Sequence, residues 1–526
     1  MLLLVLIVVA LLTLGAMSFF QRMFVEHQAV RTHIRQTQAR YLAESGIEYV
    51  KAVLLQDPDM LRQSGGTYDN ANLFQARPLF DDPVAAFRGK FTILAPKIGT
   101  DGYYGGLRYG LENESARLNL NTILLADNYQ ENGAHILLMS LPGMTDSIAD
   151  AILDWIDPDD QPRENGAEQD YYSSLSPAYK PRNGPLQSIE ELLLVRGVTP
   201  TLLFGADINR NMQIDDSEQS LTNMDGVDNS NGVMNRGWAA YLTIDSAEKN
   251  VRSDGTPKIN VNMTNLQDLH DQVSTALGDE MANFIVAYRQ GGPDTSTTAG
   301  QAASGIQIDY TQPGRVQFKT LLDLVGVKTK IAKPNQQAGS GGSQKSPSQP
   351  AQGGQGGGNS STIVVSAAFA SDTASMRDYL PKLFENLAVN AAPSIPGRID
   401  VNQAPRTILT GIPGLPPEAV DRIISTRDLE VTSDRPDRAY ETWLLTDGIV
   451  DLPTMKKLMP LVTASGSVYR AQIVGYYEDE GPGYRIEAVI DGTKTPPVVK
   501  RRRDLVEQGT GFSLDVLGGQ AVDDAK

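Results

Sequence analysis

The sequence contains no cysteine, only four histidines and only three tryptophans in 526 residues. Without cysteine the chain can form no disulfide bond, no thiolate metal site and no cysteine nucleophile. The histidines form neither an H-x-x-H nor an H-E-x-x-H pattern, and there is no G-x-S-x-G motif. Three tryptophans are too few to supply the aromatic platforms of a sugar-cleaving site. These absences predict a protein that is not an enzyme.

Positive charge is also in short supply. The chain carries 46 Lys and Arg against 63 Asp and Glu, which gives a formal net charge of −17. Binding to duplex DNA depends on Lys and Arg side chains that displace counterions from phosphates. The charge balance therefore disfavours nucleic acid as a partner, whereas it is compatible with metal cations.

Residues 1–20, MLLLVLIVVALLTLGAMSFF, lack charge entirely. A helix of that length spans about 30 Å of hydrocarbon. A removable signal peptide would instead need basic residues in front and a small-residue cleavage site behind, and neither is evident. The polar stretch that follows has no proline and one glycine up to residue 55, and its apolar residues recur mostly at helical spacing. They are Phe24, Val30, Ile34, Tyr41, Leu42, Ile47 and Val50. One continuous helix over residues 1–55 is predicted.

Three stretches of the chain repeat one pattern: a basic residue, an alternating strand end, an asparagine and a helix start. They are RLNLNTILL from Arg117, KINVNMTNL from Lys258 and RIDVNQAPRTIL from Arg398. Each is followed by two helical patterns joined at a glycine, and later by a short apolar helix that ends at glycine and Val or Ile. Glycine suits such a helix end because it takes positive φ without penalty. The pattern predicts three divergent helical units, near residues 117–205, 258–332 and 398–463.

The paired helices resemble the tandem helix-hairpin-helix domains of membrane-anchored DNA receptors in bacterial competence. In the DNA-binding members the turn reads G-x-G, and its N–H groups contact phosphate. Here Met144 follows Gly143, and Leu415-Pro416 follows Gly414, where proline has no N–H to donate. The only charges in these turns are acidic. We therefore interpret the hairpins as protein-binding structure and expect no nucleic acid; a membrane-anchored helix-hairpin-helix nucleic-acid receptor is the alternative function.

Strand patterns lie on both sides of the helical units. FTILAPKI and GGLRYGLE precede the first unit, and VYRAQIVGYYED, GYRIEAVIDG and PPVVKRRRDL follow the last. Strands from both ends can join one sheet into which the units are inserted; two separate small sheets are the alternative. Residues 333–362, rich in Gly, Ser and Gln, are predicted to be a disordered linker, and residues 511–526 a flexible tail.

The stretch DINRNMQIDDSE, residues 207–218, fits the ligand spacing of a calcium loop. Side-chain oxygens are predicted from five residues and a backbone carbonyl from a sixth. The ligands are Asp207, Asn209, Asn211, Asp215 and Glu218, with the carbonyl of Gln213. Met212 stands where a sharp turn prefers glycine, which should weaken or distort the site. A solvated acidic turn is the alternative.

Further acidic groups lie on either side of this loop. Possible ligands for a second ion, or for the same one, follow it: Asp225, Asp228, Asn229 and Asn231. A second acidic set precedes it: Asp154, Asp157, Asp159, Asp160, Glu168 and Asp170. For this second set, a helix C-terminus that runs into a polar loop is an equally good interpretation.

Taken in order, these parts resemble the K-type minor pseudopilin of type II secretion systems (general secretion pathway protein K). The resemblance covers residues 1–205 and 398–505 well. It rests on QARYLAESGIEYVKAVL, ENESARLNLNTILL, the passage LPGMTDSIADAILDWIDPDDQPRENGAEQDYY, the later LQSIEELLLVRGVTPTLLFG, and GSVYRAQIVG with RIEAVID. The most specific elements are DWID, GAEQDYY and LLLVRGVTP at this spacing. Calcium sites are known in the K-type family, which makes the second acidic set a candidate.

The resemblance implies an α+β fold. It has a long N-terminal pilin-like helix, a small antiparallel β-sheet and a large inserted α-helical region with helix-hairpin-helix-like repeats. The segments are then a transmembrane and amphipathic helix (1–55), a pilin-like core (56–116 and 464–510), helical repeat 1 with the calcium loop (117–257), repeat 2 (258–332), the linker (333–362), repeat 3 (363–463) and the tail (511–526).

The same resemblance implies a single-pass inner-membrane protein whose bulk is periplasmic. It would sit at the tip of a short pseudopilus with the I- and J-type minor pseudopilins, initiate assembly, and engage the secretin or secreted substrates, without catalysis. Pseudopilins carry a short basic leader ahead of the mature helix, which implies such a leader before Met1. We predict that Phe24, Val30 and Ile34 pack on partner helices. A type IV pilus minor pilin with adhesive function is a third possibility.

Overall fold

The computed structural model describes residues 1–219, 229, 232–332, 362–432, 434–478 and 481–519. Contacts between residues divide the chain into two units. The first comprises Met1–Lys249, Pro396–Ala439 and Pro460–Lys526, and the second comprises Asn250–Ile395 and Tyr440–Met459. The stretch predicted as repeat 3 therefore contributes residues to both units.

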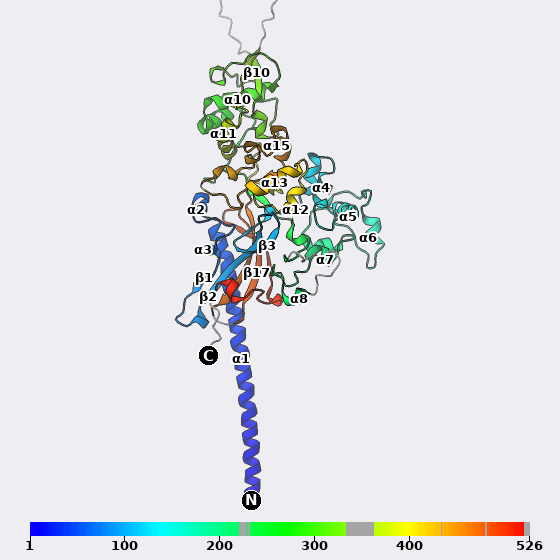
Figure 1. Cartoon of the computed structure of the whole chain (residues 1–526), viewed down its shortest axis with the longest axis vertical. Helices are drawn as coiled ribbons and strands as arrows, with labels where there is room; N and C mark the ends of the chain where they lie inside the picture. The colour runs from blue at the N-terminus through cyan, green and yellow to red at the C-terminus, as the bar shows by residue number, and fades with distance from the viewer. Residues whose placement is uncertain (220–228, 230–231, 333–361, 433, 479–480, 520–526) are drawn as a thin grey trace, which may run out of the picture. The chain divides into compact units, whose positions relative to one another are not determined.

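Helix α1 runs from Leu2 to Val53 without a break, which confirms the predicted continuous helix (Figure 1). Its buried residues begin only at Ala39 and continue at steps of three and four, through Leu42, Gly46, Val50 and Val53. Among the described residues it is the one helix that is long and apolar enough to cross a membrane, and none of its most apolar stretch is buried. The helix is thus compatible with a single-pass membrane anchor.

A sheet of seven strands packs on the second half of α1, and all its pairings are antiparallel. Five strands follow the order β1-β2-β16-β17-β18, while β3 pairs with β2 and β4 with β16. Four of the strands precede the helical region: β1 (Arg77–Phe80), β2 (Gly89–Ile98), β3 (Tyr104–Tyr109) and β4 (Glu112–Asn113). Three follow it: β16 (Val468–Tyr477), β17 (Tyr484–Asp491) and β18 (Val498–Asp504). Strands from both ends of the chain thus form one sheet, the first of the two predicted alternatives.

The two faces of the sheet carry different cores because successive side chains of a strand point to opposite sides. Ala43, Ile47 and Val50 of α1 pack against Phe91, Ile93, Ile473 and Ile486 on one face. On the other, Leu94, Val474 and Tyr476 pack against Phe512 and Leu517.

The chain beyond residue 510 differs from the predicted flexible tail as far as residue 519. Helix α16 (Leu514–Leu517) lies there, and Phe512 and Leu517 are buried. The carbonyl of Leu517 accepts hydrogen bonds from the hydroxyls of Tyr476 (2.5 Å) and Thr92 (2.8 Å). Apolar side chains that reach a hydrophobic face order a segment that composition alone marks as mobile. Residues 520–526 lie outside the described part.

The remaining elements of the first unit are short. Before β4 they are α2 (Pro58–Gln63), α3 (Ala71–Phe74) and η1 (Ala85–Phe87). Those from Glu114 to Lys249 are η2 (Glu114–Ala116), β5 (Leu118–Asn119), η3 (Ile123–Asn128), α4 (Gly133–Met139), α5 (Asp146–Ile156), α6 (Gln169–Ser173), η4 (Ile189–Leu194), α7 (Pro200–Phe204), α8 (Asp216–Gln219), η6 (Trp238–Ala240), β6 (Leu242–Thr243) and β7 (Ala247–Lys249). Those after Pro396 are β14 (Ile399–Asp400), α12 (Arg406–Thr410), α13 (Pro417–Thr426), η9 (Pro436–Ala439), β15 (Val462–Thr463) and η10 (Val506–Gln508).

The second unit is mainly helical. It contains β8 (Ile259–Asn260), α9 (Leu266–Leu277), α10 (Asp279–Gly291), β9 (Pro293–Asp294), η7 (Ala303–Gly305), η8 (Leu321–Leu324), β10 (Lys328–Ala332), β11 (Thr362–Val365), α11 (Thr373–Asn386), β12 (Leu387–Ala388), α14 (Trp443–Thr446) and α15 (Leu452–Leu458), while β13 spans Ser394–Pro396. Of the predicted linker, Thr362 opens β11, and residues 333–361 lie outside the described part.

The sequence repeat has a structural counterpart. The short first strand of each repeat pairs in parallel with a later strand, as β5 with β6, β8 with β12, and β14 with β15. The partner of β8 lies outside the predicted second repeat, because β12 (Leu387–Ala388) belongs to the stretch predicted as repeat 3. The glycines predicted to end the later apolar helices take positive φ: Gly197 (83°), Gly326 (69°) and Gly448 (65°). Helical pairs joined at a glycine of positive φ are present too, at Gly143, Gly278 and Gly414.

Candidate metal centres and interaction surface

The predicted calcium loop, residues 207–218, begins after α7 and ends within α8 in the first unit. Asp207, Asn211 and Glu218 are buried in it, and the backbone turns sharply through positive φ at Arg210 (57°) and Met212 (62°). Such values are strained for residues other than glycine. The loop is therefore tightly wound around its polar side chains.

The carboxylates among the predicted ligands accept hydrogen bonds from backbone N–H groups of the loop. The Glu218 carboxylate accepts from the N–H groups of Ile208 (3.0 Å), Asn209 (3.3 Å) and Asp215 (3.3 Å). Asp207 accepts from the N–H groups of Asn211 (3.0 Å) and Met212 (3.1 Å).

Two asparagines complete the set. The side-chain amides of Asn209 and Asn211 both donate to Asp215 Oδ2, at 2.5 and 2.9 Å. Gln213 donates its N–H to Asn211 Oδ1 at 2.8 Å. Three carboxylates and two amides on one short loop are the oxygen donors that Ca²⁺ prefers. The donor chemistry therefore fits a hard cation.

Burial raises the pKa of both Asp207 and Glu218, and the charge of Asp207 adds to the effect at Glu218. A bound cation would offset that burial and hold both groups ionised. Of the additional ligands suggested after the loop, Asp225, Asp228 and Asn231 lie outside the described residues. Asn229 is buried, and its Oδ1 accepts from the N–H of Asn235 at 2.6 Å.

A second group of carboxylates gathers at the start of α6. Carboxylate oxygens of Asp157, Asp159 and Glu168 lie within 4.8 Å of one another. Glu168 is only 4% exposed, and neither of its oxygens has a hydrogen-bond partner among the residues that the structure describes. Burial, with the nearby charges of Asp154, Asp157, Asp160 and Asp159, raises the pKa of Glu168 to about 7. A buried carboxylate with no partner is costly unless a cation or a proton neutralises it.

The other acidic residues of that passage are engaged elsewhere. Asp154 is fully buried and accepts from Arg163, which also donates to Asp157 at 2.5 Å. Asp160 accepts from the side-chain amide of Asn183 at 2.7 Å, and Asp170 lies in the first turn of α6. The sequence indicated the acidic passage but could not select these three carboxylates, because Glu168 reaches Asp157 only through the loop between α5 and α6.

Some N–H groups of the hairpin turns donate within the turn itself. In the first unit's α4–α5 turn, Leu141 and Met144 donate to the carbonyls of Leu138 and Leu141. In the α12–α13 turn, Leu415 donates to Ile412. These donors are therefore occupied within the turn rather than directed outward as a phosphate site requires.

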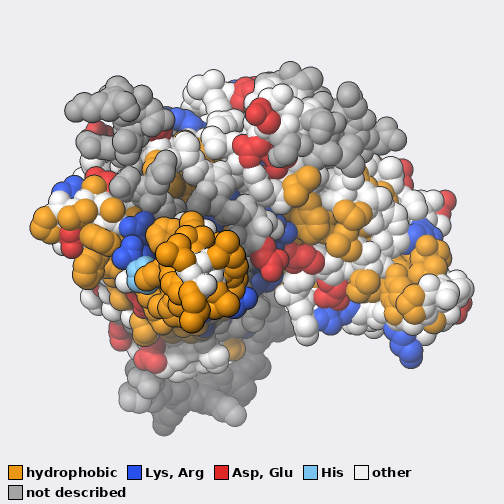
Figure 2. All heavy atoms as spheres, turned by 90° about the horizontal axis from the view of Figure 1, so that it is seen from below, with side chains coloured by type: hydrophobic (Ala, Val, Ile, Leu, Met, Phe, Trp, Pro, Cys, Tyr) orange, Lys and Arg blue, Asp and Glu red, His pale blue; other side chains and the backbone are white. Residues whose placement is uncertain are grey.

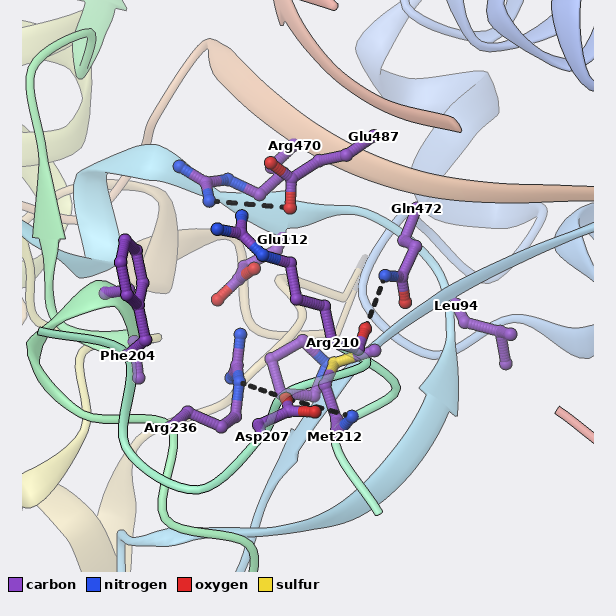
Figure 3. A pocket seen from close by; sticks show the side chains of 13 residues that line it. Leu94, Glu112, Phe204, Asp207, Arg210, Met212, Arg236, Arg470, Gln472 and Glu487 are labelled. Carbon is purple, nitrogen blue, oxygen red and sulfur yellow. Dashed lines mark hydrogen bonds and ion pairs between the residues drawn. The ribbon is translucent and has the colours of Figure 1, made fainter. Parts of the chain in front are cut away.

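A small cavity of about 60 Å³ lies where the predicted calcium loop meets the sheet (Figure 3). It is lined by charges of both signs, among them Glu112, Arg236, Arg470 and Glu487. Burial alone would raise the pKa of Glu112, but Arg117, Arg236 and Arg470 lower it to about 2. Since these charges neutralise one another, we regard the cavity as a structural ion-pair network.

The amphipathic part of α1 offers an exposed surface. Phe24, Val30 and Ile34, the predicted packing residues, are 70, 55 and 50% exposed. Seen end-on from the N-terminus, the uncharged first stretch of the same helix also presents mainly apolar side chains (Figure 2). An apolar surface of this extent on a helix calls for lipid or other helices around it.

Comparisons with known proteins match this chain to type II secretion. Residues 116–204 match the family model described as type II secretion system (T2SS), protein K. A type II secretion system protein K from Pectobacterium carotovorum is 30% identical over 204 residues, which is 38% of this chain and 58% of the relative. One from Pseudomonas aeruginosa is 29% identical over 205 residues, covering 36% and 55%. The alignments thus span little more than half of these relatives.

Two further likenesses are more limited. A protein K from Klebsiella pneumoniae is 46% identical over 52 residues, which is 10% of this chain and 16% of the relative. A chain in the crystal structure of the GspK-GspI-GspJ complex from enterotoxigenic Escherichia coli covers 90% of this chain, with 11% identity and a TM-score of 0.35.

Proposed function

This chain is similar to type II secretion system protein K, as its sequence motifs predicted, and on that premise we propose that it acts as a minor pseudopilin. The proposal places α1 in the inner membrane and the bulk of the chain in the periplasm. The protein would cap the pseudopilus tip, initiate assembly with the I- and J-type minor pseudopilins, and dock the secretin or secreted substrates. This role involves binding and no catalysis.

The main observation behind this proposal is the exposed apolar surface of the N-terminal part of α1. Its residues before Arg35 are exposed, although many of them are large and apolar. Residues 1–20 carry no charge and match the thickness of a bilayer, about 30 Å. Beyond them, Phe24, Val30 and Ile34 lie on one side of the helix at 100° per residue. Lipid can cover the first stretch, and the apolar faces of sister helices can cover the second.

Substitution of Ile34 tests the packing role. Ile34→Asp places a charge on the apolar side of α1, and we expect it to abolish copurification with the I- and J-type pseudopilins. Gln36→Asp is the matched control, because it adds the same charge two residues on, at about 200° around the helix. Copurification that survives Ile34→Asp, or that is lost equally with Gln36→Asp, would contradict a specific helix interface.

We also propose that calcium is a structural ligand of this protein. Calcium would be held by the loop side chains of Asp207, Asn209, Asn211, Asp215 and Glu218 with the Gln213 carbonyl, and a second cation by Asp157, Asp159 and Glu168. When bound, the ion supplies positive charge that neutralises carboxylates which the fold brings together. The three neighbouring carboxylates around Glu168 and the oxygen-donor chemistry of the loop support this.

Calorimetric titration of the full chain in detergent with calcium tests the two centres separately. We expect Glu218→Gln to remove the binding heat of the loop and Glu168→Gln to remove that of the second centre, each leaving the other intact. Asp81→Asn, an exposed carboxylate outside both centres, should leave both heats unchanged. No heat in the unsubstituted protein would refute the calcium proposal.

A further inference from the structure

Two segments far apart in the sequence meet on the face of the sheet opposite to α1, which we call the outer face. They are the predicted calcium loop, residues 207–218, and the C-terminal segment, residues 511–517. The side-chain amide of Asn211 donates to the carbonyl of Gly511 at 2.8 Å. Arg485 of β17 joins them, since its guanidinium donates to the carbonyl of Asn209 and lies 5.6 Å from the centre of the Phe512 ring. Gln472 of β16 donates to the carbonyl of Arg210 at 2.7 Å (Figure 3). Polar contacts thus fix the loop to both the sheet and the C-terminal segment.

Met212 adds an apolar contact between the same parts. It occupies the loop position where glycine is preferred and has positive φ, 62°. This conformation costs a residue with a side chain roughly 1–2 kcal/mol. The side chain packs on the cluster formed by Leu94, Val474, Tyr476, Phe512 and Leu517. The packing contact with this cluster, rather than the backbone conformation of the turn, accounts for methionine at this position.

The groups that would hold the cation are the groups that make these contacts. Asn211 would present Oδ1 to the ion while its Nδ2 binds Gly511, and the N–H of Met212 donates to Asp207. Asn211 and Met212 are the two loop residues that touch the C-terminal segment. A cation that fixes Asn211 directly, and Met212 through Asp207, would therefore restrain both contacts. We propose that the loop is a calcium-dependent clasp that holds residues 511–517 on the sheet. This inference rests on the calcium proposal made above.

The clasp couples two binding events, and such coupling is reciprocal. Calcium stabilises the docked C-terminal segment, and the docked segment raises the affinity of the loop for calcium. Removal of calcium loosens residues 511–517 and uncovers the apolar side chains of Leu94, Val474 and Tyr476.

Hydrogen exchange measured by mass spectrometry on the full chain in detergent tests the clasp. On addition of the chelator EGTA, exchange in residues 511–517 should rise roughly tenfold, the loss expected for one or two hydrogen bonds. Helices α9 and α10 of the second unit serve as the internal control and should not change. The variant Met212→Gly removes the apolar contact with the C-terminal segment while keeping every predicted ligand, and it should show a smaller response to EGTA at residues 511–517.

Phe512→Ala provides a second variant outside the loop. By reciprocity it should weaken calcium binding severalfold while leaving all predicted ligands in place. Calcium binding with no change of exchange at 511–517, or with unaltered affinity in Phe512→Ala, overturns the clasp and leaves the calcium and pseudopilin proposals standing. Absence of calcium binding in the unsubstituted chain overturns both the clasp and the calcium proposal, but not the pseudopilin role.

Discussion

Asp400 shows how a single residue can depart from a repeat. It stands where the other two repeats have Asn119 and Asn260, and all three make the same turn. Asp400 Oδ1 accepts from the N–H of Asn402 at 2.8 Å, as Asn260 Oδ1 does from that of Asn262 at 2.9 Å. Asp400 is only 2% exposed, and burial raises its pKa to about 7. A titratable group thus replaces a neutral one inside the first unit.

This carboxyl group makes stability depend on pH. In the unfolded chain it loses its proton near its ordinary pKa of about 3.9, whereas in the fold it keeps the proton up to about pH 7. As the pH rises from the unfolded pKa to the folded pKa, the contribution of Asp400 to the free energy of unfolding therefore falls, and above the folded pKa it stays low. For Asp400→Asn, we expect the free energy of unfolding relative to the natural protein to rise between pH 4 and pH 8, by roughly 2–4 kcal/mol.

Urea denaturation of the full chain at several pH values measures this difference. Asp81→Asn is the control, because it makes the same chemical change at an exposed carboxylate. A constant difference for Asp400→Asn over the same range would show that Asp400 is ionised in the fold.

At the scale of elements, two glycines of one helix lie in opposite surroundings. A Cβ at Gly46 would lie 2.5 Å from Cγ2 of Ile473 and 3.2 Å from Cδ2 of Phe91, so α1 approaches the sheet as closely as a glycine permits. A Cβ at Gly15 would meet nothing within 4 Å. The C-terminal half of α1 therefore packs closely against the sheet, whereas its N-terminal half is exposed.

We expect Gly46→Val to lower the free energy of unfolding by about 1–3 kcal/mol, since overfilling a packed interface forces side chains apart. Gly15→Val makes the same change in the same helix and should leave unfolding unaltered. Thermal denaturation in detergent compares the two. Equal effects would mean that the helix propensity of valine, rather than contact with the sheet, determines the result.

At the scale of the whole molecule, one motif recurs in both units. The side chain of Asn121 accepts from the N–H of Leu186 at 2.7 Å and donates to its carbonyl at 3.1 Å. Asn262 binds the N–H and the carbonyl of Phe318 in the same way, at 2.8 and 2.9 Å. In these two repeats the asparagine thus ties the first strand to the segment that leads into the later apolar helix, which gives a physical reason for its presence in both.

We expect Asn121→Ala to destabilise the first unit and Asn262→Ala the second, each by about 1–3 kcal/mol, because two backbone groups lose their partners. Hydrogen exchange localises the effect: residues 186–194 should open more readily in the first variant, and residues 318–324 in the second. The two variants are controls for each other. Faster exchange in both segments from either substitution would contradict independent ties.

The sequence by itself determined what short-range patterns encode. Helical spacing and an uncharged stretch predicted α1, alternation predicted the strands, and the recurrence of glycine predicted turns of positive φ. The likeness to type II secretion system protein K was also readable from motifs. Tertiary structure decided what depends on contacts between distant residues: the ordering of Phe512 and Leu517, the selection of Asp157, Asp159 and Glu168, and the packing of Met212. Periodicity is a property of neighbouring residues, whereas burial depends on which segments the fold brings together.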